Sequence, residues 1–87
     1  MKTVIIDCKK LKGHKRAHGY LKKVFGFPEY YGANLDALYD CLTEIGECKV
    51  VLKNRESLPK SDGYGKKILA VIEDAGRDNE RFTVDAE

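Results

Sequence analysis

The chain has 87 residues, which suffices for one domain with a modest core, and we expect a single domain over residues 1–87. Its composition, 43% hydrophobic and 34% charged, is typical of a soluble globular protein, and no apolar run approaches the ~20 residues of a membrane span. The apolar run near the N-terminus, residues 4–6, is shorter than the about 7–15 residues of a signal peptide, so we expect an unexported, cytoplasmic protein.

The formal net charge is only +2, but the charges are distributed unevenly along the chain. Residues 1–23 contain eight of the sixteen basic residues and one acidic residue. Residues 24–48 contain five acidic residues and neither Lys nor Arg. We therefore expect an acidic surface that suits a basic partner and, elsewhere on the molecule, a basic surface.

The first half of the chain predicts a strand followed by two helices. Residues 3–7, TVIID, are short, apolar and β-branched, which favours a strand. Residues 13–25 carry apolar side chains at helical spacing. After a loop at residues 26–32, Asn34 is a suitable N-cap for a second helix. The apolar spacing predicts that the buried face of that helix consists of Leu35, Leu38, Leu42 and Ile45. We expect Gly46 to end the helix.

The second half predicts a strand, a helix and a strand. The segment KVVLK, residues 49–53, favours a strand, and a polar loop follows it. A helix is expected at residues 63–75, capped by Ser61 or Asp62, and a last strand at residues 81–85. This alternation of strands and helices predicts an α/β fold with a parallel sheet and right-handed crossovers.

Three acidic residues of the second helix, Asp36, Asp40 and Glu44, lie four positions apart and should form one stripe. Like charges at this spacing weaken a helix by roughly 0.2–0.5 kcal/mol per pair. The residues three and four positions from Asp40 include no cation, so Asp40 has no partner on its own helix. Periodicity alone leaves two interpretations open, a solvated charged face and a binding face for a basic partner.

Tyrosines near the stripe favour the binding face. Tyr39 falls beside the acidic residues, and Tyr30 and Tyr31 lie in the loop that leads into the helix. Carboxylates edged by tyrosines are typical of an interface hot spot. We expect at least one of the two loop tyrosines to belong to the core.

Other residues predict no active site. His14 and His18 have a spacing that can hold zinc, but no third ligand is near, and we expect both on a solvated helix edge. The basic segment HKRAHGYLKK, residues 14–23, could contact RNA phosphates, although basic helix faces are usually only solvated. Neither a nucleophile elbow nor a placed general base is evident, so we expect no enzyme, cofactor or metal. The odd number of cysteines without CxxC spacing indicates reduced thiols, with Cys41 packed as a small hydrophobic residue.

The stretch FPEYYGANLDALYDCLT, residues 27–43, resembles the signature region of the barstar family of intracellular ribonuclease inhibitors. A weaker likeness covers most of the chain. The resemblance implies a two-layer fold with three or four helices packed on a three-stranded parallel sheet. It also implies an inhibitor that protects its producer from a secreted barnase-like ribonuclease, without enzymatic activity.

The resemblance implies a partner-binding site on the second helix and its surroundings. Two aspartates would enter the ribonuclease active site and take the place of RNA phosphates, and the loop tyrosine would contact the enzyme. An acid of the last helix would also reach the partner, with Glu73 as the alternative to Asp74. The implied site residues are Tyr30, Asp36, Tyr39, Asp40, Thr43, Glu44 and Asp74.

The chain departs from the family pattern in its slightly positive net charge, where barstar is acidic, in a shorter loop before the last helix, and in particular residues. Tyr39 stands where barstar has Trp, and Glu44-Ile45 stands where barstar has Gly-Trp. Two further hypotheses therefore accompany the inhibitor. One is an RNA-binding or RNA-processing accessory protein that uses the basic first helix. The other is a module on the same scaffold that binds another basic protein.

Overall fold

The structure is a computed structural model that describes residues 2–58 and 63–86. Within these ranges, the order of strands and helices agrees with the prediction, and two short 3₁₀ turns, η1 and η2, add to it. The elements are β1 (Lys2–Asp7), η1 (Cys8–Lys10), α1 (His14–Phe25), α2 (Leu35–Glu44), β2 (Cys48–Lys53), η2 (Arg55–Ser57), α3 (Tyr64–Asp78) and β3 (Phe82–Ala86).

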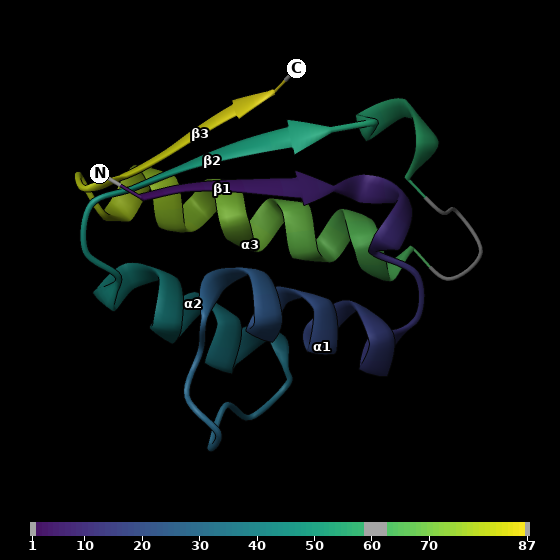
Figure 1. Ribbon diagram of the computed structural model, residues 1–87, viewed down its shortest axis with the longest axis horizontal. Helices are drawn as coiled ribbons and strands as arrows, with labels where there is room; N and C mark the ends of the chain where they lie inside the picture. Colours follow the sequence, from purple (N-terminus) through teal and green to yellow (C-terminus); the bar gives the residue numbers. More distant parts are fainter. Residues whose placement is uncertain (1, 59–62, 87) are drawn as a thin grey trace.

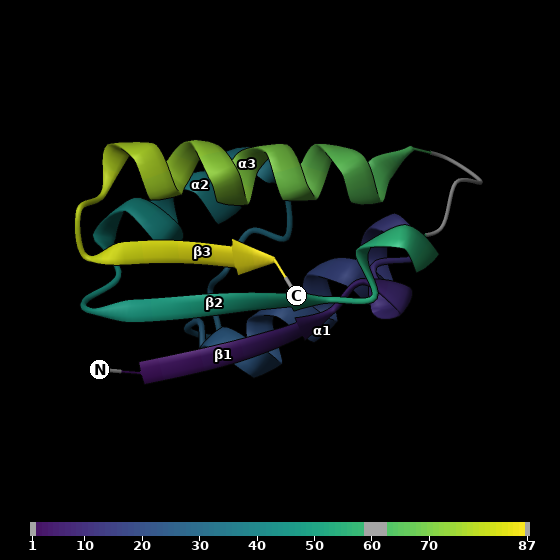
Figure 2. The ribbon, with the colours of Figure 1, turned by 90° about the horizontal axis from the view of Figure 1, so that it is seen from above.

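The strands form a parallel sheet in the order β1-β2-β3, in which Val50 pairs with Val4 on one side and Val84 on the other. The helices α1, α2 and α3 lie on one face of this sheet, as Figures 1 and 2 show. Burial alternates accordingly along β1, where Ile6 is buried while Ile5 is 51% exposed. The predicted α/β fold with a three-stranded parallel sheet and helices packed on it is therefore confirmed.

The core lies between the sheet and the helices. Its large side chains with no more than 1% exposure include Ile6, Val50, Leu52 and Phe82 of the strands and Leu21, Leu38, Leu42, Ile68 and Ile72 of the helices. Burial raises the pKa of all three cysteine thiols, so each stays protonated at neutral pH. All three are free thiols, as predicted, and Cys41 is only partly buried.

The end of α2 differs from the prediction. The helix ends at Glu44, because Ile45 has extended backbone angles of φ −67° and ψ 145°. The Ile45 side chain still packs against the core, but from outside the helix. Its predicted place on the buried helix face is therefore wrong, although its predicted burial is partly right.

The bounds of α3 also differ. The helix continues through Gly76 to Asp78. A Cβ atom at Gly76 would lie 3.2 Å from Cγ2 of Val84, so this glycine permits close packing on β3 and does not end the helix. At the other end Gly63 takes the N-cap position, and the predicted caps, Ser61 and Asp62, lie outside the described residues.

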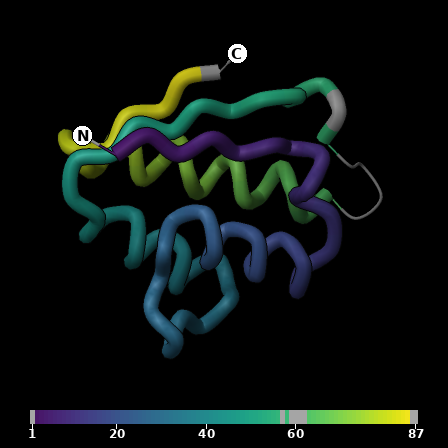
Figure 3. The backbone as a smooth tube through the Cα atoms, viewed as in Figure 1, coloured from purple at the N-terminus to yellow at the C-terminus, as the bar shows by residue number. Residues whose placement is uncertain are grey.

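The loop between α1 and α2, residues 26–34, projects from the helix layer away from the sheet, as Figures 1 and 3 show. It brings the tyrosines of this segment beside α2.

Among the described helices, none has the length and hydropathy that a bilayer crossing requires.

Candidate functional site

The start of α2 is fixed by Asn34. Its backbone is extended, with φ −141° and ψ 171°, and its Oδ1 accepts a hydrogen bond of 2.8 Å from the backbone N–H of Ala37. Such a cap contributes about 1 kcal/mol to a helix. Asp36 follows in the first turn, where a carboxylate interacts favourably with the helix dipole. The predicted cap is therefore confirmed, and it sets which residues of α2 face outward.

The three carboxylates of α2, Asp36, Asp40 and Glu44, form the acidic stripe, and all three residues are exposed. The opposite face of the helix is buried through Leu38 and Leu42. No basic side chain in residues 2–58 and 63–86 forms an ion pair with the stripe. The stripe therefore presents negative charge that the described part of the molecule does not neutralise.

The two loop tyrosines have different environments. Tyr30 is 88% exposed. The ring of Tyr31 packs against Phe27 at a centroid distance of 4.7 Å, and its hydroxyl lies 2.7 Å from Nδ1 of His18. Burial raises the pKa of Tyr31, so its hydroxyl stays protonated. The expectation that at least one loop tyrosine packs with the core is thus confirmed for Tyr31.

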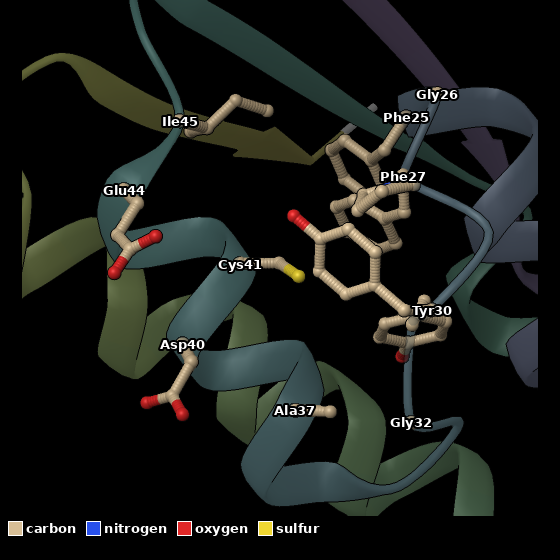
Figure 4. A pocket seen from close by; sticks show the side chains of 12 residues that line it. Phe25, Gly26, Phe27, Tyr30, Gly32, Ala37, Asp40, Cys41, Glu44 and Ile45 are labelled. Atoms are coloured by element: carbon tan, nitrogen blue, oxygen red, sulfur yellow. The ribbon is translucent and has the colours of Figure 1, made fainter.

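A hollow of about 480 Å³ lies between this loop and α2, and we call it the site hollow. Its lining includes the aromatic residues Phe27, Tyr30 and Tyr31 on one side and the acidic residues Asp40 and Glu44 on the other. Figure 4 shows that the acidic side chains project from α2 away from the aromatic rings. The site hollow therefore combines an apolar wall with a negatively charged edge.

Cys41 also lines the site hollow, and its side chain points toward the loop in Figure 4. Burial raises the pKa of its thiol, and the charges of Glu44 and Asp40 add to this effect. The thiol is thus held in its neutral, weakly nucleophilic form. Cys41 contributes shape to the site hollow rather than reactivity.

Asp36 lies beside a second hollow of about 260 Å³, which His14, Leu35 and Tyr64 also line. Asp36 and Asp40 therefore share the acidic stripe but border different hollows, one toward the start of α3 and one toward the loop. The structure leaves both carboxylates accessible from outside the molecule.

Tyr39 and Thr43 are half-buried and bonded within the fold. The hydroxyl of Tyr39 donates a hydrogen bond to Oδ2 of Asp78 on α3, and this bond raises the pKa of Tyr39. Oγ1 of Thr43 donates to the backbone oxygen of Asp40 at 3.0 Å. Tyr39 lies beside the acidic stripe, as predicted from its position, and both residues have structural contacts.

Asp74 extends the negative charge from α2 to α3. After the hydrogen bond to Asp78 and burial, the charges of Asp78, Asp74 and Asp40 also raise the pKa of Tyr39. Arg77 pairs with Asp74 one helical turn along α3 and offsets part of its charge. Glu73 instead pairs with Arg55 of η2 at 3.6 Å. Asp74 and Glu73 thus each have an arginine partner, Arg77 of α3 and Arg55 of η2.

The predicted solvated helix edge for both histidines is wrong for His18, which is 1% exposed. Its position relative to Leu21 and Phe25, three and seven residues later, places it on the buried face of α1. Its Nε2 lies 2.5 Å from the hydroxyl of Tyr64. The helical spacing of the apolar residues could have indicated that His18 is buried. Its hydrogen-bond partners, Tyr31 and Tyr64, could not be predicted, because they lie 13 and 46 residues away in the sequence. No group of three or more His, Cys, Asp or Glu in the described residues could hold a metal ion.

Sequence reasoning also missed Asn79, which supports the end of the acidic helix. Its Nδ2 donates to the backbone oxygens of Leu42 at 2.9 Å and Ile45 at 3.1 Å, and its Oδ1 accepts from the N–H of Arg81 at 3.0 Å. Asn79 thereby ties the end of α3 to the end of α2 and the start of β3. Asn79 lies four residues beyond the predicted end of the helix, so no local pattern indicated this role.

We expect Asn79→Ala to lower the free energy of unfolding by about 1–3 kcal/mol, because two backbone carbonyl groups in partly buried hydrogen bonds lose their donor. Urea unfolding followed by circular dichroism measures this loss. Asn79→Asp is the matched variant, because it keeps the acceptor for Arg81 and removes the donor to Leu42 and Ile45. We expect it to be at least as destabilising as the alanine. A stable Asn79→Asp protein would contradict this role.

The fold and the site together describe a small α/β protein that exposes an acidic helix beside an aromatic loop. The family model described as Barstar (barnase inhibitor) matches residues 1–87, so the chain belongs to the barstar family. It is also 41% identical, over 78 residues, to a Bacillus subtilis (strain 168) protein named "Putative ribonuclease inhibitor YrdF". That alignment covers 86% of each chain. The resemblance seen in the signature region is therefore confirmed, and the family's members are inhibitors rather than enzymes.

Proposed function

We propose that this protein is a cytoplasmic inhibitor of a secreted barnase-like ribonuclease of the guanyl-specific type. The inhibitor would place the acidic stripe of α2 in the cationic active-site cleft of the enzyme and block access of RNA. The observation that carries this proposal is the exposure of Asp36 and Asp40 without an ion pair in the described residues of a barstar-family chain.

The physical basis is mimicry of phosphate. A ribonuclease cleft must hold the phosphates of RNA with cationic donors, and carboxylates form charge-assisted hydrogen bonds with the same donors. The mutual repulsion of Asp36, Asp40 and Glu44 is relieved when those cations arrive. Opposite potentials on the two surfaces also increase the association rate at low salt.

The remaining candidate residues would act around this charged centre. Tyr30 would cover the enzyme surface beside the site hollow, because its side chain is almost fully exposed. Tyr39 and Thr43 would contact the partner with the parts that their internal hydrogen bonds leave accessible. Glu44 and Asp74 would add negative charge at the rim, where ion pairs contribute little affinity and mainly influence the association rate.

The proposal is tested by cleavage of a labelled RNA by a barnase-like ribonuclease. The purified protein should slow cleavage at a one-to-one ratio and should not change the mobility of the RNA in a gel. Inhibition with no RNA binding would support the acidic site. An RNA mobility shift that weakens steeply with salt, without inhibition of the enzyme, would support the RNA-binding hypothesis instead.

We expect Tyr30→Ala to weaken inhibition by about 30-fold, which corresponds to about 2 kcal/mol for an exposed aromatic hot spot. The free energy of unfolding should change by less than about 0.5 kcal/mol, because the ring is 88% exposed. The ribonuclease assay and urea unfolding measure the two effects. Ile5→Ala is the control, since Ile5 is also an exposed large apolar residue but lies on the open face of the sheet. Equal effects of both variants would remove Tyr30 from the site.

A further inference from the structure

A buried histidine lies behind the proposed site and does not line either of its hollows. His18 of α1 is 1% exposed, and both of its ring nitrogens face tyrosine hydroxyls. Nδ1 lies 2.7 Å from the hydroxyl of Tyr31, and Nε2 lies 2.5 Å from the hydroxyl of Tyr64. The ring therefore joins α1, the loop between α1 and α2, and the first residue of α3.

This arrangement suits the neutral imidazole. A neutral ring has one N–H donor and one acceptor nitrogen, and a tyrosine hydroxyl can serve as the partner of either. One tyrosine accepts from His18 while the other donates to it. Protonation would turn the acceptor nitrogen into a second donor and place a positive charge in the interior.

Both halves of the proposed site lie against this cluster. Tyr31 directly follows the exposed Tyr30, and its ring lines the site hollow with Asp40. Tyr64 lines the second hollow together with Asp36. A displacement of His18 would thus act on the tyrosine loop and on the start of the acidic stripe.

The groups that face His18 offer little to balance a positive charge. His14 of α1 lies at a ring distance of 5.1 Å, and the polar groups of the described residues that face the ring nitrogens are the hydroxyls of Tyr31 and Tyr64. On α2, Cys41 lies near Tyr31, and Asp36 borders the hollow of Tyr64 but is exposed to solvent. Within the described residues, no carboxylate contacts the ring itself. Burial, followed by the charge of His14, lowers the pKa of His18.

We propose that neutral His18 is a positioning residue, which holds Tyr31 and with it the loop that carries Tyr30, and that its protonation in mildly acidic solution loosens the loop and releases the partner. The release of the partner rests on the proposed function. The loosening of the loop concerns the free protein and can be tested without any partner.

The direction of the pH effect follows from the difference between folded and unfolded states. The pKa of His18 is below its ordinary value of 6.5 in the folded protein, so the folded state binds this proton less readily than the unfolded state. The stabilising contribution of the neutral ring is fully present above pH 6.5. It is lost as the pH falls below that value toward the lowered pKa.

The first experiment measures amide hydrogen exchange of residues 26–34 in the free protein at pH 7.5 and pH 5.5. Protection factors correct for the intrinsic pH dependence of exchange. We expect the protection factors of the wild-type loop to fall about tenfold on acidification. A tenfold change is the effect of one pH unit on a single titrating group. In His18→Gln, whose side chain offers a neutral donor and acceptor, the factors should not respond to pH. His14→Gln keeps the His18 ring and should still respond to acid, but less than the wild type, because it removes the neighbouring charge that helps to lower the pKa of His18.

Tyr31→Phe provides a second variant, in case the glutamine is poorly accommodated. It removes the hydroxyl that faces Nδ1 and keeps the ring, so loop protection should be low at both pH values. A wild-type loop that is equally protected at both pH values would overturn the inference. An acid response of His18→Gln equal to that of the wild type would do the same.

The second experiment measures the inhibition constant against a barnase-like ribonuclease at the same two pH values. The ratio of wild type to His18→Gln cancels the titration of the enzyme's own groups. We expect this ratio to rise about three- to tenfold from pH 7.5 to pH 5.5, within the factor for one pH unit in a single group. A constant ratio would overturn the acid release. If no variant inhibits the enzyme at either pH, the proposed function and the acid release both fail, while a pH-responsive loop still supports the positioning role.

Discussion

Asp40→Ala is expected to weaken inhibition of a barnase-like ribonuclease by about 30- to 5,000-fold. This range corresponds to the about 2–5 kcal/mol lost when one partner of a hydrogen-bonded interfacial charge pair is removed. Asp40 lies in the middle of the acidic stripe and borders the site hollow, so in the complex its carboxylate would be shielded from water and surrounded by cations. The loss should appear mainly as faster dissociation.

The same substitution should leave the free protein as stable as the wild type or slightly more stable. Asp40 forms no ion pair in the described residues, and its neighbours on the helix surface are the like-charged Asp36 and Glu44. Removing it relieves repulsion of roughly 0.2–0.5 kcal/mol for each neighbour. The free energy of unfolding should therefore stay the same or rise while inhibition weakens. A variant that is simply misfolded would lose both.

Two further variants separate charge from shape and position. Asp40→Asn keeps the size of the side chain and removes its charge, so it should lose most of the inhibition that the alanine loses. Asp85→Ala removes an exposed carboxylate from β3, where Asp85 pairs with Lys49 at 3.3 Å, and should inhibit like the wild type. If Asp40→Asn inhibits fully, the carboxylate is not the group that replaces phosphate, and the mimicry fails.

The sequence predicted the acidic helix well because its signals are local. The cap at Asn34 depends on a side chain reaching three residues along the chain. The buried positions Leu38 and Leu42 follow from helical spacing. Once these fix the orientation of the helix, Asp36 and Asp40 can only point outward. The order of strands and helices likewise allowed only a few sheet topologies, because parallel strands need crossover connections.

The contacts that the sequence did not predict join residues distant along the chain. Tyr64 meets His18 across 46 positions, and Tyr39 meets Asp78 across 39. Such pairs depend on how the helices pack together, which no local pattern encodes. Histidine and tyrosine also occur both in cores and on surfaces, so their type alone did not decide their place. The contacts that the sequence did not predict are therefore mainly the hydrogen bonds that connect the site to the other helices.

The buried side of α2 gives the second large effect. We expect Leu38→Ala to lower the free energy of unfolding by about 2–5 kcal/mol, the range for a leucine removed from a packed core. Leu38 has no exposed surface, and the cavity left behind would lie under the acidic stripe. The midpoint of urea unfolding should fall while the slope of the transition stays unchanged, because the folded state remains compact. Leu35→Ala is the matched control on the same helix. Its side chain is only partly buried, so its loss should be smaller.

Together with Asp40→Ala, this variant tests whether the two faces of α2 have separate tasks. Folded Leu38→Ala protein still presents Asp36 and Asp40 outward, because the cap at Asn34 and the bonds from Asn79 hold both ends of the helix. We therefore expect its inhibition constant, corrected for the folded fraction, to stay within about threefold of the wild type, because the substitution removes no group that faces the partner. A loss as large as that of Asp40→Ala would mean that the geometry of the stripe depends on the core beneath it. The acidic surface could then not be treated as a site that a rigid helix presents.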